Sequence, residues 1–239
     1  MKRQIISGLA VSLILTAAAF GTPENAQKEP PVSERQITIR IRDYAQADTS
    51  VRQHAEQVAG EILQKTGVNI RWIECPEGSS GTGPCASPMS SLVLILNLLP
   101  HSMSDRLHAS GGALGVAIER NGSDFGYIAS IFYEEAKERA RERQVNFGEL
   151  LGDVIAHELG HLLLGTNSHS GRGLMCAFWS GYQLSLGARG LLEFSDKEIK
   201  RIHAAMNART LAATGASAEP ADLSRVASAS ESFSAGENQ

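Results

Sequence analysis

The sequence FGELLGDVIAHELGHLLL, residues 147–164, has the apolar periodicity of an α-helix. Its apolar side chains leave little polar surface, so the pattern predicts a helix that is buried in the core of a domain. A helix of this kind needs other elements packed around it, and the residues upstream supply candidates.

Five strands are expected before this helix, at residues 36–42, 68–73, 92–98, 112–119 and 126–132. The first strand alternates strictly between apolar and polar residues, and the third is a dense apolar run. Helices are expected at residues 50–66 and 133–143; the charges of the second are typical of a solvated helix face. An early strand–helix–strand unit followed by further strands predicts an α+β domain, with a mixed, mostly parallel sheet of about five strands packed on helices.

The amino terminus has the layout of a secretory signal. Lys2 and Arg3 precede a short apolar stretch that ends in Ala17-Ala18-Ala19, so residues 1–20 are interpreted as a signal peptide. An uncleaved membrane anchor is the alternative, although the stretch is short for a span. We therefore expect an exported protein, periplasmic or extracellular, with no membrane contact after signal cleavage.

The composition also separates a central domain from its flanks. Residues 21–35 are polar and proline-bearing, as a linker would be, and residues 211–239 contain almost no large apolar residue, so we expect a disordered tail there. A single domain over residues 36–210 is left between them. Ser195 and Glu198 form a capping box that predicts a short helical part at its end, to about residue 209.

The charge and the cysteines limit partners and compartment. A formal charge of −4 is small, so neither nucleic acid nor an anionic membrane is expected as a partner. Nothing in the sequence indicates an oligomeric state. Cys75 and Cys85 bracket a Gly/Ser/Pro loop and could form a disulfide in an oxidising compartment, the alternative being two unpaired thiols. Cys176 is then the odd cysteine, and we expect a buried thiol.

Residues 157–161 read His-Glu-Leu-Gly-His. On a helix the side chains at i and i+4 share one face, so the imidazoles of His157 and His161 can reach the same ion. Paired histidines are costly to bury in so apolar a helix unless they are coordinated or hydrogen-bonded. Glu158 lies beside that ion and can take a proton from the water that the metal activates. The motif therefore predicts a zinc site with Glu158 as general base.

Catalytic zinc usually takes three protein ligands and keeps one position open. Gly165 can end the helix and turn the chain back, which would bring His169 to the ion as the third ligand. Two alternatives stay open at this stage: Glu193, because a distant carboxylate completes the site in other HExxH enzymes, and Asn167, a weak neutral ligand.

The segment HELGHLLLGTNSH, followed by Gly173-Leu174-Met175, resembles the metzincin zinc metalloproteases, and among them small exported bacterial peptidases with a HELGHLLLG motif. Those proteins carry HExxHxxGxxH and a later methionine turn beneath the zinc. Gly165 comes one residue later, and His169 two residues later, than this spacing. The resemblance implies zinc on His157, His161 and His169, Glu158 as general base, and Met175 as a possible equivalent of the methionine.

The expected function is therefore that of a secreted zinc metallopeptidase with Glu158 as general base. By analogy with metzincins, a peptide or protein substrate would lie extended along the sheet edge formed by residues 112–119. Two other functions stay open: a non-catalytic, zinc-stabilised exported binding module, and an HExxH hydrolase with Glu193 as third ligand.

Overall fold

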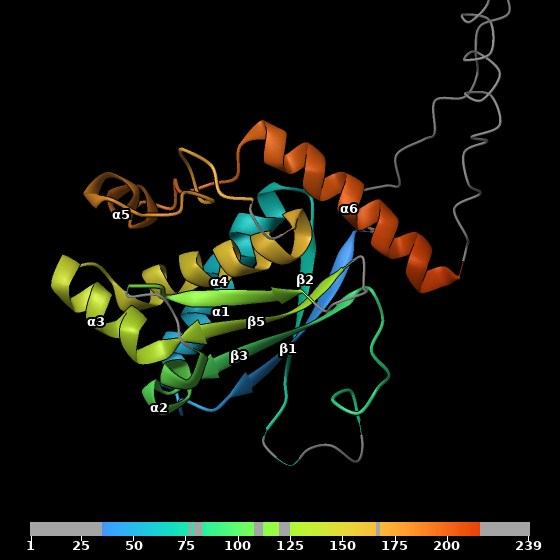
Figure 1. The fold of residues 1–239 in the computed structure, drawn as a ribbon, viewed down its shortest axis with the longest axis horizontal. Helices are drawn as coiled ribbons and strands as arrows, with labels where there is room; N and C mark the ends of the chain where they lie inside the picture. Colours follow the sequence, from blue (N-terminus) through green and yellow to red (C-terminus); the bar gives the residue numbers. More distant parts are fainter. Residues whose placement is uncertain are drawn as a thin grey trace, which may run out of the picture.

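The computed structural model describes residues 35–76, 78, 83–107, 112–119, 125–165 and 168–215 (Figure 1). The expected signal peptide, nearly all of the expected linker, and residues 216–239 lie outside these ranges. So does the Asn121-Gly122 turn expected between the last two strands.

One five-stranded sheet organises the described part of the chain. Its order is β2-β1-β3-β5-β4, and every neighbouring pair is parallel except β4 and β5, which are antiparallel. The predicted α+β fold with a mixed, mostly parallel sheet is therefore confirmed. The strands are β1 (Gln36–Asp43), β2 (Asn69–Glu74), β3 (Val93–Leu99), β4 (Gly115–Glu119) and β5 (Gly126–Phe132).

The helices predicted from the sequence are present between and after the strands, and the structure has three further short helical segments. The helices are α1 (Thr49–Lys65), α2 (His101–Ser104), the 3-10 turn η2 (Asp105–Leu107), α3 (Tyr133–Arg143), α4 (Phe147–Leu164), α5 (Gly181–Gly187) and α6 (Asp196–Thr214). Sequence periodicity missed α2, η2 and α5, because helices this short carry too few repeats to show a pattern. No helix in the described ranges combines the length and the apolar character needed to cross a bilayer.

The core lies between one face of the sheet and the helices α1 and α4 (Figure 1). Alternate residues of the three central strands point into it because successive side chains of a strand face opposite sides. Helix α4 is buried along almost its whole length, as its composition predicted, and it contacts α1, α3, α6, β4 and β5. The strand residues of this core are Ile37, Ile39, Ile41, Leu94, Leu96, Leu98, Ala129 and Ile131.

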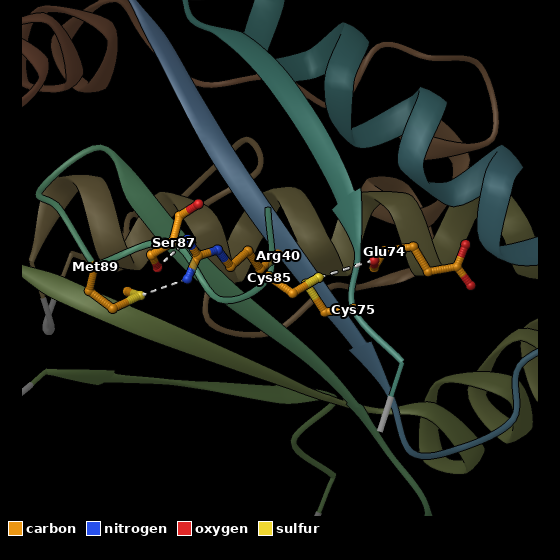
Figure 2. The surroundings of a disulfide bond; sticks show 6 residues. All are labelled: Arg40, Glu74, Cys75, Cys85, Ser87 and Met89. Atoms are coloured by element: carbon orange, nitrogen blue, oxygen red, sulfur yellow. Dashed lines mark hydrogen bonds between the residues drawn. A yellow bond between two sulfur atoms is a disulfide. The ribbon is translucent and has the colours of Figure 1, made fainter. Parts of the chain in front are cut away.

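The disulfide ties the loop segment 83–92, which leads into β3, to the end of β2 on the other face of β1 (Figure 2). Cys75 and Cys85 are bonded, as one of the two sequence interpretations predicted. Beside them the buried Arg40 of β1 donates to the carbonyl of Ser87 at 2.7 Å and to the sulfur of Met89 at 3.6 Å. The loop therefore supplies partners for a guanidinium that the sheet alone would leave without any.

Two predicted boundaries are wrong by a few residues. Arg35, assigned to the linker, is 4% exposed, and its carbonyl accepts from the backbone N–H of Asn69, so it belongs to the domain. Helix α6 continues to Thr214, past the expected start of the tail at residue 211, and ends before Gly215 in the left-handed conformation. Residues 211–214 (Leu-Ala-Ala-Thr) favour continuation because Ala and Leu are good helix formers.

Candidate metal centre

Helix α4 carries the HELGH motif and is capped at both ends. Asn146 caps its amino terminus, accepting a hydrogen bond from the backbone N–H of Glu149 at 3.1 Å. Gly165 ends the helix with a φ of 93°, a conformation that favours glycine, and the chain turns back from there. His157 and His161 therefore lie one turn apart on the last half of a buried helix.

Three imidazoles converge at this point. Nε2 of His161 lies 3.1 Å from Nε2 of His157 and 3.1 Å from Nε2 of His169. The ligand atoms of the three residues all fall within 4.8 Å of one another, close enough to hold one metal ion. Nitrogens around a tetrahedral zinc at about 2.1 Å would be roughly 3.4 Å apart, which is close to the observed spacing.

The far side of each α4 histidine is held by a hydrogen bond. Nδ1 of His157 lies 2.8 Å from the carbonyl oxygen of Leu174, and Nδ1 of His161 lies 3.0 Å from the hydroxyl of Ser168. A carbonyl oxygen can only accept, so Nδ1 of His157 carries the proton and Nε2 keeps its lone pair for the cluster. Trp179 donates to the same carbonyl at 3.1 Å.

Two backbone hydrogen bonds fix the segment that carries His169 and Leu174. The backbone N–H of Ser170 donates to the carbonyl of Met175 at 2.8 Å, and that of Leu174 donates to the carbonyl of Glu193 at 2.9 Å. These bonds fix the positions of His169 and of the Leu174 carbonyl. Asn167, one of the alternative third ligands, lies outside the described residues.

Met175 packs against α4 at Gly160, the residue between the two helix histidines in sequence. It is fully buried, and a Cβ placed on Gly160 would lie 2.6 Å from its sulfur. The glycine between the two histidines therefore gives the methionine its space. Cys176 differs from the expectation of a buried thiol: it is half-buried, lines the cleft beside the histidines, and its sulfur donates to the carbonyl of Phe178 at 3.3 Å.

Glu158 faces a cleft of about 690 Å³ that the edge strand β4 borders. The carboxyl is 6% exposed and packs against Gly115, where a Cβ would lie 2.8 Å from Cγ of Glu158. Of the described residues, the histidine cluster, one carboxyl group and the backbone of the edge strand β4 line this cleft.

Burial shifts the pKa values of Glu158 and His157, in opposite directions. It raises the pKa of Glu158 to about 8, because the cleft wall disfavours a carboxylate. Burial also lowers the pKa of His157 to about 4; the hydrogen bond with Leu174 opposes this shift and the neighbouring His169 adds to it. His157 is therefore neutral near pH 7, as a metal ligand must be.

Glu193 does not join the cluster. Its carboxylate forms an ion pair with Lys65 at 2.7 Å, and both side chains are about half exposed. The three histidines are the only group of potential ligands that come together within the described ranges. Of the two candidates for the third position that the structure describes, His169 lies with the cluster and Glu193 does not.

Sequence reasoning missed the residues that support the site. Ser168, Trp179 and Gly115 come from two loops and a strand, and no fixed spacing connects them to the HELGH motif. The one available signal is that Ser168 directly precedes His169, which places a hydroxyl next to the third ligand.

Scans of this chain against protein-family models and against the curated proteins find no match.

Proposed function

We propose that this protein is a zinc metallopeptidase that hydrolyses peptide bonds, with Glu158 as general base. The observation that supports this most is the convergence of three histidine Nε2 atoms in a cleft that also holds a buried carboxyl and a free strand edge. A binding site for a structural metal needs neither the carboxyl nor the strand edge.

The donor set fits zinc. Three neutral imidazoles with one position left open are a common arrangement at catalytic zinc sites, and hydrogen bonds from the outer ring nitrogens orient such ligands. When bound, zinc supplies Lewis acidity, which lowers the pKa of water and polarises a carbonyl group. His157, His161 and His169 would hold it.

Glu158 would move the proton. Its carboxylate accepts a proton from the attacking water and later donates it to the amine that leaves. Burial raises the pKa of Glu158. The positive charge of a cation held by the three histidines would oppose this shift and favour the carboxylate.

Strand β4 would bind the substrate. It is an edge of the sheet, paired on one side only with β5, and its residues 115–117 border the cleft next to Glu158. An extended peptide can add to such an edge through backbone hydrogen bonds, which place its carbonyl groups in a row along the cleft.

Two further parts of the proposal follow. The packing of Met175 against Gly160, between the two helix histidines in sequence, supports the proposal of a metzincin-like enzyme. The proposal includes export to the periplasm or the extracellular space, and the Cys75–Cys85 disulfide supports it because such bonds persist in oxidising compartments.

The test compares Glu158→Gln with a matched control, Glu193→Gln, whose carboxylate lies away from the cleft. Zinc-loaded proteins are incubated with a broad peptide library, with and without a chelator, and products are identified by mass spectrometry. We expect wild type and the control to cleave, Glu158→Gln to retain zinc and folding but lose activity about 10²–10⁴-fold, and the chelator to stop all cleavage. Full activity of Glu158→Gln would remove Glu158 from this role, and a zinc-loaded wild type that cleaves nothing would favour a binding module.

A further inference from the structure

Helix α3 presents two arginines to the cleft. Arg139 and Arg143 are four residues apart, so they share one face of the helix, and both line the cleft that contains Glu158 and the histidines. Arg141 faces elsewhere: its side chain is 76% exposed and pairs with Glu138. The charged run that sequence patterning assigned to solvent therefore has one cationic face on the cleft.

The two arginines differ in the acidic groups near them. Nε of Arg139 lies 3.5 Å from the Glu142 carboxylate, a long contact on the exposed side of the helix. Arg143 forms no hydrogen bond or ion pair with any other residue of the described ranges. Arg139 also lines a smaller hollow, together with His101 and acidic side chains of α3. Among the described residues that line the main cleft, Glu158 is the one carboxyl group, so the end of the cleft next to α3 is cationic.

The arginines lie next to a defined part of the substrate strand. A Cβ on Gly112 would lie 3.6 Å from Nη2 of Arg139, whereas Glu158 packs against Gly115, three residues later. The chain thus passes Arg139 just before β4 begins and reaches Glu158 at its first residue. Arg139 and Glu158 therefore lie next to successive parts of the same chain segment, Arg139 at Gly112 and Glu158 at Gly115.

The direction of pairing fixes which part of a peptide meets the arginines. Antiparallel pairs are commoner and slightly more stable than parallel ones. A peptide antiparallel to β4 runs from the residue 119 end toward Gly112. Its carboxyl-terminal part, beyond the carbonyl that faces Glu158, would therefore lie beside Arg139 and Arg143.

We propose that Arg139 and Arg143 form a cationic subsite that selects a substrate carboxylate on the leaving-group side of the scissile bond. This inference rests on the proposed peptidase function. Guanidinium groups pair with carboxylates through two parallel hydrogen bonds, which gives selectivity over neutral amides of the same shape. The carboxylate comes either from an Asp or Glu side chain just after the cut or from the free carboxyl terminus of a short peptide.

The test uses zinc-loaded full-length protein and peptides that differ only in the residue after the cut: Asp, Asn or Lys, each as a free acid and as a carboxyl-terminal amide. We expect kcat/KM to favour a carboxylate roughly five- to tenfold, as for a half-exposed charge pair. The double variant Arg139→Gln/Arg143→Gln should bring this ratio to about one, and Arg139→Glu/Arg143→Glu should reverse it in favour of Lys. Arg141→Gln, on the solvent side of the same helix, should keep the wild-type ratio.

A binding experiment separates the subsite proposal from the peptidase proposal. The same peptides are labelled with fluorescein, and their binding to Glu158→Gln is measured by fluorescence anisotropy. Selective binding of carboxylates that depends on the two arginines supports the subsite even if wild type cleaves nothing. Cleavage and binding that are equal for Asp, Asn and Lys, with either terminus, would overturn the subsite and leave the peptidase function standing. If amidation of the terminus alone removes the preference, the selected carboxylate is the peptide's own carboxyl terminus; if the Asp preference survives amidation, it is the side chain.

Discussion

The carbonyl oxygen of Leu174 lies 2.8 Å from Nδ1 of His157 and sets the nitrogen that this histidine offers to a metal. Because a carbonyl cannot donate, the ring proton is held on Nδ1 and the lone pair of Nε2 faces His161 and His169. Leu174 is itself fixed by the hydrogen bond that its backbone N–H donates to the backbone carbonyl oxygen of Glu193. The ligand geometry thus depends on a loop seventeen residues further along the chain.

His169 is expected to be the third metal ligand. His169→Ala removes one of three donors, so zinc affinity should fall by at least about tenfold, while Glu193→Ala, which breaks only the pair with Lys65, should bind zinc like wild type. Competition with a chromogenic chelator measures the affinity, and elemental analysis measures the metal content. The reverse ranking of the two variants would give the third position to the carboxylate.

Gly115 is expected to set the position of the Glu158 carboxyl. A Cβ at this position would lie 2.8–3.0 Å from Cγ, Cδ and Oε1 of Glu158, so Gly115→Ala must displace that side chain. We expect kcat to fall about tenfold or more, because the general base loses its position, while zinc content stays the same. Gly181→Ala, where an added Cβ meets nothing within 4 Å, serves as the control. Wild-type kcat in Gly115→Ala would show that the carboxyl can act from a second position.

The sequence predicts those parts of the fold and of the candidate site whose residues have a regular spacing along the chain. His157 and His161 were predictable because four residues make about one turn of helix, whereas Trp179 reaches the site through a loop whose path has no sequence signal. Arg143 shows another limit: periodicity indicates an exposed helix face, but not that the face borders a cleft. Helix α5, with seven residues and glycine at both ends, gives too weak a pattern to predict.

Asp153, one turn before His157 on α4, is expected to cost stability at neutral pH. It is 3% exposed beneath Gly187 of α5, and burial, with a smaller effect from Glu149, raises its pKa from 3.8 to about 7. The folded state therefore holds this proton more tightly than the unfolded chain, so unfolding free energy falls as the pH rises from about 4 to about 7.

Asp153→Asn removes that ionisation while keeping the shape of the side chain. The stability gained over wild type should grow through this pH window and then level off at a few kcal/mol at most, since one pKa unit corresponds to about 1.4 kcal/mol. Urea denaturation at several pH values and constant zinc load measures it. Parallel stability curves for the two proteins would mean that Asp153 ionises normally.

Arg209 of α6 is expected to be the main tie between the last helix and the rest of the domain. It is 1% exposed and donates to the carbonyls of Ser91, Gly126 and Leu162 at 2.7–2.8 Å, with its guanidinium over the ring of Phe125. Burial lowers its pKa to about 10, so it stays charged at neutral pH.

Replacing this arginine with methionine keeps much of the volume but leaves three buried carbonyl groups without their donor. We expect Arg209→Met to reduce the free energy of unfolding by about 3 kcal/mol, because unsatisfied buried acceptors carry their full desolvation cost. Lys200→Met, on the exposed side of α6, should change it by less than about 0.5 kcal/mol. Because Leu162 lies in the turn that holds His161, Arg209→Met should also lower zinc affinity in the fraction that stays folded. An unchanged urea midpoint would show that α6 is held by its apolar contacts, through Ile202 and Met206, rather than by the arginine.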